Sequence, residues 1–236
     1  MGIFNVKQLR KYNNTPFVTY TFVAIVLVMY GITLLRFGTT ESSHALIEMG
    51  AKFAPNMVWY GEWWRLLTAA FLHIGLQHLA MNLVSLYFIG IELEYILGHR
   101  RFATLFFVSA FGGNVLSFAF SESVAAGAST ALYGMFAAFI VLAYLYPESN
   151  YLRNRSTSFT TLLILNLVFS VMYPGIDIWG HVGGLVYGAG ITFIMGISQA
   201  RSLLWAKPYR IVTAILMLGV SGGLVYYGIE QIRSLF

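Results

Sequence analysis

The sequence predicts an all-α fold, a polytopic bundle of membrane-spanning helices, and three observations support this class. Hydrophobic residues make up 58% of the 236 positions and charged residues only 10%, which leaves too little polar surface for a water-soluble domain. Apolar stretches long enough to cross about 30 Å of hydrocarbon recur along the chain. The 14 Lys and Arg residues are scattered in ones, twos and threes between these stretches. The solvent for this chain is therefore expected to be the bilayer.

Windows of about 20 apolar residues predict seven spanning helices. We expect them at 16–37, 68–96, 102–120, 128–146, 158–174, 178–199 and 210–230. The first follows Lys7, Arg10 and Lys11, as in a signal peptide, but it is too long for the apolar region of one. We interpret it as a retained span. No internal repeat and no linker between soluble domains interrupts the pattern, which favours one membrane domain.

The basic residues predict the orientation of the spans. With the N-terminus inside, ten of the 14 Lys and Arg residues fall in cytoplasmic segments and four in external ones. Residues 1–15 are then a cytoplasmic N-terminus, residues 16–200 hold six spans and residues 201–236 an additional C-terminal span. One long external loop, 38–67, is expected to lie in the outer leaflet. It carries aromatic residues typical of the headgroup level: Trp59, Tyr60, Trp63 and Trp64.

Composition also excludes several classes of function. The net charge of +5 is not collected into a basic stripe, so we expect no nucleic-acid partner. Cysteine is absent, which excludes disulfides, a thiolate nucleophile and a thiolate metal site. We expect no metal and no cofactor. The sequence does not predict an oligomeric state.

Strongly polar side chains inside a span are costly unless they are paired or line a cavity, so each is a functional candidate. Four stand out: His78, Asn82, Ser129 and His181. They lie toward the starts of the second, fourth and sixth spans, which all run from outside to inside in the predicted orientation. We therefore expect all four at a similar depth, in the outer half of the membrane.

Spacing places these residues on defined helix faces. Asn82 is four residues after His78, and Tyr133 four after Ser129, so each pair shares a face. Small residues at Gly184 and Gly188 would let the His181 face approach the Ser129 face closely. A hydrogen bond between Ser129 and His181 is then expected. In such a pair the imidazole takes the serine proton and later protonates the leaving amine.

Other readings of the polar residues are weaker. Asp177 precedes the sixth span by position, and we interpret it as a helix cap rather than the third member of a triad. His73 is assigned a structural role, because five residues separate it from His78 and would splay the two around a helix. The sequence contains no His-Glu-x-x-His motif and so does not predict a zinc protease. A single aspartate cannot supply the two aspartate carboxylates that an aspartyl protease needs. Arg65 and Glu94 are expected to serve buried polar networks.

Several motifs resemble those of the rhomboid intramembrane serine proteases over roughly residues 60 to 195. They are Gly127-Ala128-Ser129 with Tyr133, His181-Val182-Gly183-Gly184 with Gly188, His78-Leu79-Ala80-Met81-Asn82, Trp64-Arg65 and Glu92-Leu93-Glu94. The resemblance implies a six-helix core, and the seventh span resembles the C-terminal addition of some members. One departure is Thr130, which stands where the family usually has glycine.

The resemblance implies an intramembrane endopeptidase in the cell membrane that cleaves transmembrane proteins, with its site open to the external side. Ser129 would be the nucleophile and His181 the general base and acid. His78, Asn82 and the backbone N–H of Ser129 would stabilise the oxyanion. The supporting residues would be Tyr133, Gly127, Gly184 and Gly188, with Tyr133 packed against the His181 ring. The alternatives are a non-catalytic rhomboid-like protein that binds transmembrane clients, favoured by Thr130, and a small transporter, for which paired broken helices are missing.

Overall fold

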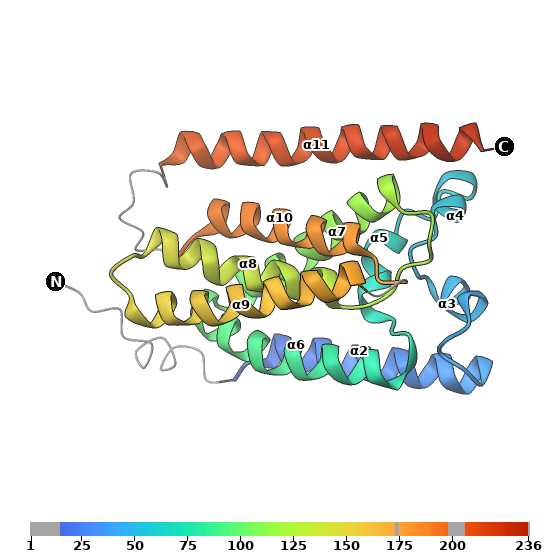
Figure 1. Ribbon diagram of the computed structural model, residues 1–236, viewed down its shortest axis with the longest axis horizontal. Coiled ribbons are helices and arrows are strands. Elements are labelled where there is room, and N and C mark those ends of the chain that lie inside the picture. Colours follow the sequence, from blue (N-terminus) through green and yellow to red (C-terminus); the bar gives the residue numbers. More distant parts are fainter. Residues whose placement is uncertain (1–14, 173–174, 198–205, 236) are drawn as a thin grey trace.

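The computed structural model describes residues 15–172, 175–197 and 206–235, and the described chain consists of helices and their connections. The long helices lie side by side in one bundle (Figure 1). They are α2 (Phe17–Phe37), α6 (Gly75–Leu97), α7 (His99–Phe120), α8 (Ser129–Leu145), α9 (Asn150–Met172), α10 (Ile178–Met195) and α11 (Lys207–Ser234). Each corresponds to one predicted span. The predicted cytoplasmic N-terminus falls almost wholly outside the described residues.

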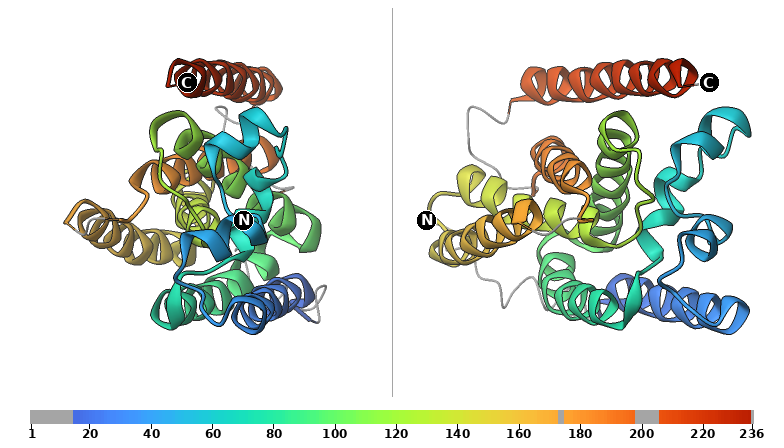
Figure 2. Two further views of the ribbon diagram at one scale, coloured as in Figure 1. Left: turned by 90° about the vertical axis from the view of Figure 1, so that its right-hand side faces the viewer. Right: turned by 45° about the vertical axis from the view of Figure 1, so that its right-hand side comes forward.

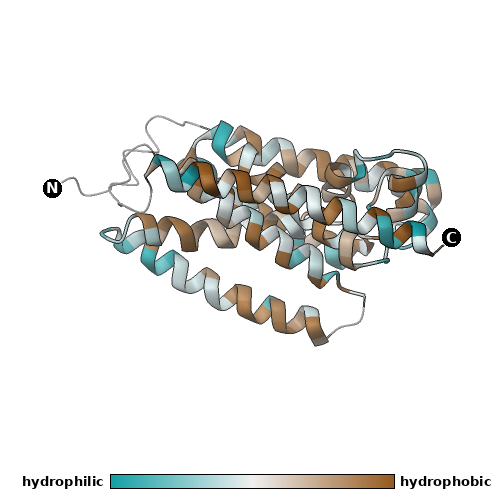
Figure 3. Cartoon of the chain, turned by 90° about the horizontal axis from the view of Figure 1, so that it is seen from above, coloured by the Kyte–Doolittle hydropathy of each residue, from teal (hydrophilic) through white to brown (hydrophobic). Residues whose placement is uncertain are grey.

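Among the described helices, six are long and apolar enough to cross a membrane. The other long helix, α8, has 17 residues and is surrounded by its neighbours, with every residue from Thr130 to Phe139 buried. Hydrophilic residues gather toward the two ends of the bundle and hydrophobic ones along its length (Figure 3). The predicted fold class, a helical bundle in a multi-pass membrane protein, is confirmed.

Two predicted boundaries are wrong. The second span was expected from residue 68, but Ala69–Phe71 form a short 3-10 helix, Leu72 is extended, and α6 begins only at Gly75. The fifth was expected from residue 158, whereas α9 begins at Asn150, because its polar first two turns continue the helix beyond the apolar window. The first difference matters for the site, since it moves His73 out of the helix that carries His78.

The predicted loop at 38–67 contains three short helices, α3 (Ser43–Met49), α4 (Ala54–Trp59) and α5 (Arg65–Thr68). Arg65 is 4% exposed and holds them together. Its Nη1 donates to the carbonyl oxygens of Ile47 at 2.7 Å and Ala51 at 2.8 Å, while its Nε donates to Glu62. A buried guanidinium needs such acceptors on every side. The expected role of Arg65 in a buried polar network is confirmed.

Glu94 makes a second buried network, which joins α2 to α6. Its carboxylate is fully buried and accepts hydrogen bonds from the first turn of α2, from Val18 N at 3.0 Å and Thr19 N at 2.8 Å. It also contacts Nδ1 of His99 at 2.5 Å. A carboxylate satisfies the free N–H groups at a helix start and complements the helix dipole. The network role expected for Glu94 is therefore confirmed.

The two helices that carry Ser129 and His181 approach each other through glycines. A Cβ atom at Gly184 would lie 2.0 Å from the carbonyl oxygen of Thr130, and one at Gly188 would lie 2.2 Å from Cα of Gly134. Only the absence of a side chain permits this approach of α8 and α10. The close contact expected from the small residues is present, and it sets the distance between the two candidate catalytic side chains.

Helix α11 lies at the periphery of the bundle (Figure 2). It contacts α10 through a hydrogen bond of 2.6 Å between Tyr187 Oη and Ser221 Oγ, and it contacts α7 where Gly228 meets the ring of Phe118. Most of its remaining surface is exposed, including Ile215, Leu216 and Leu218. The helix therefore adds to the bundle from outside and supplies no side chain to the site described below.

Candidate active site

Ser129 is the first residue of α8, and a sharp turn presents it. Gly127 has a φ of +143°, and Ala128 returns to right-handed backbone before the helix begins. The first helical N–H groups have no partner within their own helix, so the start of α8 offers donors and the positive end of a dipole. A Cβ atom at Gly127 would lie 2.7 Å from Cε1 of His78. Glycine is thus required here for both conformation and space.

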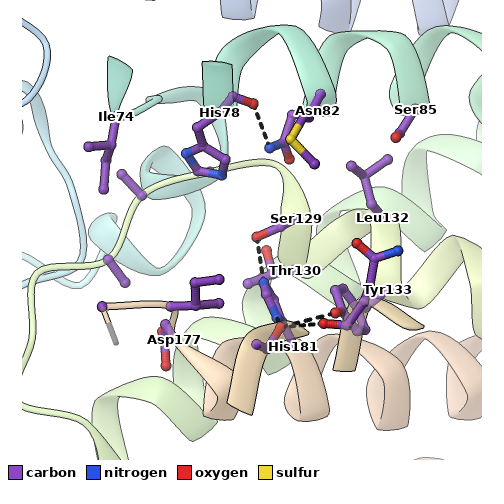
Figure 4. A pocket seen from close by; sticks show the side chains of 18 of the residues that line it. Ile74, His78, Asn82, Ser85, Ser129, Thr130, Leu132, Tyr133, Asp177 and His181 are labelled. Carbon is purple, nitrogen blue, oxygen red and sulfur yellow. Dashed lines mark hydrogen bonds between the residues drawn. The ribbon is translucent and has the colours of Figure 1, made fainter. Parts of the chain in front are cut away.

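The structure brings Ser129 and His181 into contact. Nε2 of His181 lies 3.1 Å from Oγ of Ser129, within hydrogen-bond distance. Figure 4 shows Ser129 between His181 and His78. The ring of Tyr133 stacks on that of His181, with centroids 4.1 Å apart and planes at 11°. Stacking fixes the plane of the imidazole, so that its Nε2 stays directed at the serine.

The other nitrogen of His181 has a partner that the sequence did not suggest. Its Nδ1 lies 2.9 Å from Oγ of Ser170 on α9, and Ser170 Oγ donates to the carbonyl oxygen of Asn166 at 2.8 Å. Since that bond uses the hydroxyl proton, Ser170 accepts from Nδ1–H of His181. Nε2 is then the unprotonated nitrogen and can accept the proton of Ser129. The signal available in the sequence was the polar pair Asn166 and Ser170 inside the fifth span.

His78 and Asn82, the other two candidates, lie on α6 on the opposite side of Ser129. The Asn82 amide donates to the carbonyl oxygen of His78 at 2.9 Å, which uses one of its two N–H groups. Its Oδ1 is buried without a hydrogen-bond partner in the described part of the chain. The second N–H of Asn82 and the ring of His78 remain as donors that can serve a group bound beside Ser129.

His73 is closer to the site than we expected. It precedes α6, so the predicted splay around a helix is wrong, and its ring centroid lies 5.2 Å from that of His78. Its Nε2 accepts a hydrogen bond of 3.3 Å from the backbone N–H of Ala128. Burial lowers the pKa of His73 to about 3, and the neighbouring His78 adds to the shift. His73 therefore stays neutral, as an acceptor for the backbone beside Ser129 must.

Asp177 has the capping role that the sequence predicts. One carboxylate oxygen accepts from the backbone N–H of Gly180 at 3.2 Å, at the start of α10. The other oxygen is buried and has no hydrogen-bond partner among the described residues. The hydrogen bonds described for the His181 ring run to Ser129 and Ser170, so no carboxylate completes a triad in the described chain.

Thr130 does not crowd Ser129. Its methyl group occupies the space left by two glycines on neighbouring helices, because Cβ atoms at Gly113 and Gly180 would lie 2.7 Å and 3.3 Å from it. The side chain is 6% exposed. The β-branched residue after the serine is thus accommodated by packing.

The site opens into a cavity of about 790 Å³. It is bounded on one side by α6, through Met81, Asn82 and Ser85, and on the other by α9, through Phe169 and Ser170. Met81 and Phe169 are also exposed on the outside of the bundle. The lining of the cavity therefore runs from Ser129 to side chains that are exposed on the outside of α6 and α9.

Residues 60–198 match the Rhomboid domain family model, which is more than half of the chain. The chain belongs to the rhomboid family. It is 34% identical to "Rhomboid protease GluP" of Bacillus subtilis (strain 168) over 219 residues, covering 93% of this chain and 42% of that protein. It is 36% identical to "RHOMBOID-like protein 1" of Arabidopsis thaliana over 209 residues, and 34% identical to "Rhomboid-like protease 1" of Toxoplasma gondii over 184.

The chain spans only part of the length of these relatives. The chain spans about half of the Arabidopsis protein, 53%, and 61% of the Toxoplasma protein. The matched range begins before α5 and ends after α10, so it contains Ser129, His181 and the residues that surround them. Helix α11 lies outside the matched range.

Proposed function

We propose that this rhomboid chain is an intramembrane serine endopeptidase that cleaves transmembrane proteins, with Ser129 as nucleophile and His181 as general base and acid. The observation that carries the proposal is the 3.1 Å contact between His181 Nε2 and Ser129 Oγ at the wall of a cavity. Two relatives that share the matched domain are named proteases. No observation favours the client-binding alternative, since the packing of Thr130 leaves Ser129 free.

The reaction follows from the geometry. His181 Nε2 takes the proton of Ser129 as Oγ attacks the scissile carbonyl carbon, and the carbonyl oxygen becomes an oxyanion. The N–H of Ser129 lies at a helix start, and His78 and Asn82 face the same place, so these groups supply the stabilising donors. The imidazolium then protonates the leaving amine as the C–N bond breaks. Water, deprotonated by His181, hydrolyses the resulting ester and restores Ser129.

The position of the cavity supports a transmembrane substrate. A segment entering between α6 and α9 would pass from lipid directly to Ser129. A helix shields its own backbone carbonyls, so the cleaved bond should lie near a small residue and near helix-breaking neighbours that let the segment unwind. We also propose, from the distribution of basic residues, that the Ser129 end of the bundle faces the outside of the cell.

The test is labelling and cleavage by the purified protein in detergent and in liposomes. A fluorescent alkyl fluorophosphonate and a model transmembrane substrate are compared for wild type, Ser129→Ala, His181→Ala and Ser158→Ala. Ser158 lies on the exposed face of α9 and serves as the matched control. We expect labelling and cleavage in the wild type and control, and neither in the two dyad variants. A folded wild type that neither labels nor cleaves would contradict the proposal.

Ser170 is proposed to orient His181 by accepting its Nδ1–H. Ser170→Ala should lower kcat about 10-fold, because the imidazole loses the partner that fixes its tautomer, while KM changes by less than about 2-fold. The measurement is steady-state cleavage in detergent, with Ser158→Ala as control. Wild-type kcat in Ser170→Ala would show that Tyr133 alone holds the ring.

A further inference from the structure

Lys52 lies between α3 and α4, and its side chain is completely buried, with 0% exposed. Lysine is among the residues least often buried in proteins, and a buried ammonium needs partners for its three N–H groups. Lys52 is remote in sequence from Ser129, and neither the dyad nor the oxyanion donors use it. The hydrogen-bond partners of Lys52 show which part of the chain it holds in place.

The Lys52 ammonium is surrounded by backbone carbonyl oxygens. Nζ donates to the carbonyl oxygens of Ser123 at 2.7 Å, Ser121 at 2.8 Å and Ser117 at 3.4 Å. Three N–H groups therefore face three acceptors. Ser117 lies in the last turn of α7, which ends at Phe120, so the cation also lies at the negative end of a helix dipole.

The backbone of Lys52 holds the same stretch of chain. Lys52 N donates to Ala125 O at 2.9 Å, and Ala125 N donates to Lys52 O at 3.0 Å, which forms an isolated antiparallel bridge. The stretch 121–128, which we call the approach segment, connects α7 to Ser129. Lys52 thus binds the approach segment through both side chain and backbone.

Two further bonds fix the end of the approach segment next to the nucleophile. Gly127 N donates to Ala69 O at 2.9 Å, and Ala128 N donates to His73 Nε2 at 3.3 Å. These bonds act on the two residues before Ser129, whereas Lys52 acts on residues 121–125. If the Lys52 contacts were lost, the bonds of Gly127 and Ala128 and the apolar packing of Val124 and Ala126 against Leu46, Ala51 and Leu72 would remain, but residues 121–123 would lose the donor that holds their carbonyl oxygens.

We propose that Lys52 is a positioning residue for the reaction. Its ammonium holds the approach segment so that Gly127 stays beside His78 and Ser129 stays within hydrogen-bond distance of His181. This inference rests on the proposed function. Val124, Ala125 and Gly127 also line the cavity, so the same contact shapes the wall against which a substrate lies. A displacement of the nucleophile by about 1 Å is sufficient to lower kcat strongly.

The contact between the Lys52 ammonium and the approach segment depends on pH. Burial lowers the pKa of Lys52 to about 8, and the charge of Asp177 at the start of α10 opposes the shift. Glu122, the charged residue of the approach segment itself, is exposed. A neutral amine has two N–H groups and a lone pair, so one of the three carbonyl oxygens then loses its donor. The contact between Lys52 and the approach segment therefore weakens as the pH rises through 8.

The effect on folding stability has the opposite sign. Between pH 8 and the ordinary pKa of lysine, near 10.4, the unfolded chain binds the proton that folded Lys52 has lost. Stability rises with pH wherever the unfolded state binds more protons, so the Lys52 contribution to stability increases over this range. Loss of activity caused by Lys52 deprotonation is therefore not accompanied by loss of the fold, which separates positioning from a structural role.

The experiment measures kcat, KM and the melting temperature between pH 6.5 and 10 for wild type, Lys52→Met, Lys52→Arg and Lys207→Met. Methionine has an unbranched side chain that is one heavy atom shorter than that of lysine and has no donor, and arginine keeps its charge throughout. Lys207 is exposed at the start of α11, at the opposite end of the bundle from α4 (Figure 1), and is the matched control. Fluorophosphonate labelling of Ser129 is followed in each sample.

In the wild type and in Lys207→Met we expect kcat to fall above about pH 8, at nearly constant KM and without a lower melting temperature. Lys52→Met should have a kcat about 10-fold lower at pH 7, with no fall above pH 8. Lys52→Arg should keep its kcat up to pH 10.

Any one of three results would overturn the inference. The first is a wild-type kcat in Lys52→Met at pH 7, and the second is a fall of kcat above pH 8 that is the same with and without Lys52. The third is a loss of activity in the variants that only follows the loss of folded protein. If Lys52→Met or Lys52→Arg does not fold, the wild-type profile still decides, because kcat and melting temperature falling together would contradict positioning. A wild type that is not labelled at Ser129 would instead contradict the proposed function.

Discussion

Gly184→Ala and Gly188→Ala are expected to prevent α8 and α10 from packing, and so to cause the largest loss of stability of any change considered. The added methyl group would lie 2.0 Å from Thr130 O in the first variant and 2.2 Å from Gly134 Cα in the second. Both obstacles are backbone atoms of α8, which cannot rotate away as a side chain can. The helices must separate, at a cost of about 3 kcal/mol or more, and the contact between Ser129 and His181 is lost with them.

The measurement is the SDS midpoint of unfolding in mixed micelles, together with fluorophosphonate labelling. Gly219→Ala and Gly223→Ala on α11 are matched controls, because nothing lies within 4 Å of a Cβ atom at either position. Alanine is the better helix former, so the controls should be as stable as the wild type or more so. Wild-type stability and labelling in Gly184→Ala would show that α8 and α10 are not in close contact.

Gly127→Ala is expected to lower kcat at least about 100-fold while the bundle stays folded. A side chain at a φ of +143° is strained, and its Cβ atom would lie 2.7 Å from Cε1 of His78 and 3.5 Å from Oγ of Ser129. The turn must change, which moves both the proposed nucleophile and a candidate oxyanion donor. Since Gly127 lies in a connection and not between packed helices, the effect on global unfolding should be smaller than that of Gly184→Ala.

Gly61→Ala separates backbone strain from the contact with His78. Gly61 also has a positive φ, of +70°, but nothing lies within 4 Å of a Cβ atom there, and it is in the connection between α4 and α5. This control should lose about 1 kcal/mol of stability and keep its kcat. Steady-state cleavage and the SDS midpoint distinguish the two variants. Equal kcat for Gly127→Ala and wild type would contradict the role of the turn.

The candidate dyad of Ser129 and His181 could be predicted from the sequence because two independent patterns indicate it. Apolar windows and the distribution of basic residues place the start of the fourth span and the start of the sixth at the same depth, and the glycines after His181 indicate the face that a neighbour can approach. Both patterns reflect local rules, the length of a span and the size of a residue. Their agreement predicts that Ser129 and His181 meet without any knowledge of how the remaining helices are arranged.

Ser170 and His73 could not be identified in the same way. The contact of Ser170 with His181 depends on how α9 is rotated and tilted against α10, and hydropathy does not encode rotation. The mostly apolar window that begins at residue 68 predicts a helix at His73, yet the chain turns there and brings the His73 ring to the backbone of Ala128. An apolar window predicts burial, and burial alone does not distinguish a helix from a tight turn beside it.

The sequence by itself determined that the chain is a helical membrane protein, which segments form its long helices, and which serine and histidine can meet. These properties depend on composition, length and the spacing of small and polar residues along single helices. Only the tertiary structure decided which tautomer His181 adopts, that two glycines accommodate Thr130, and that a lysine of the 38–74 region holds the backbone leading to Ser129. The physical reason is that hydrogen bonds and steric contacts act over about 3 Å between residues remote in sequence, and only the packed arrangement of helices brings such residues within that distance.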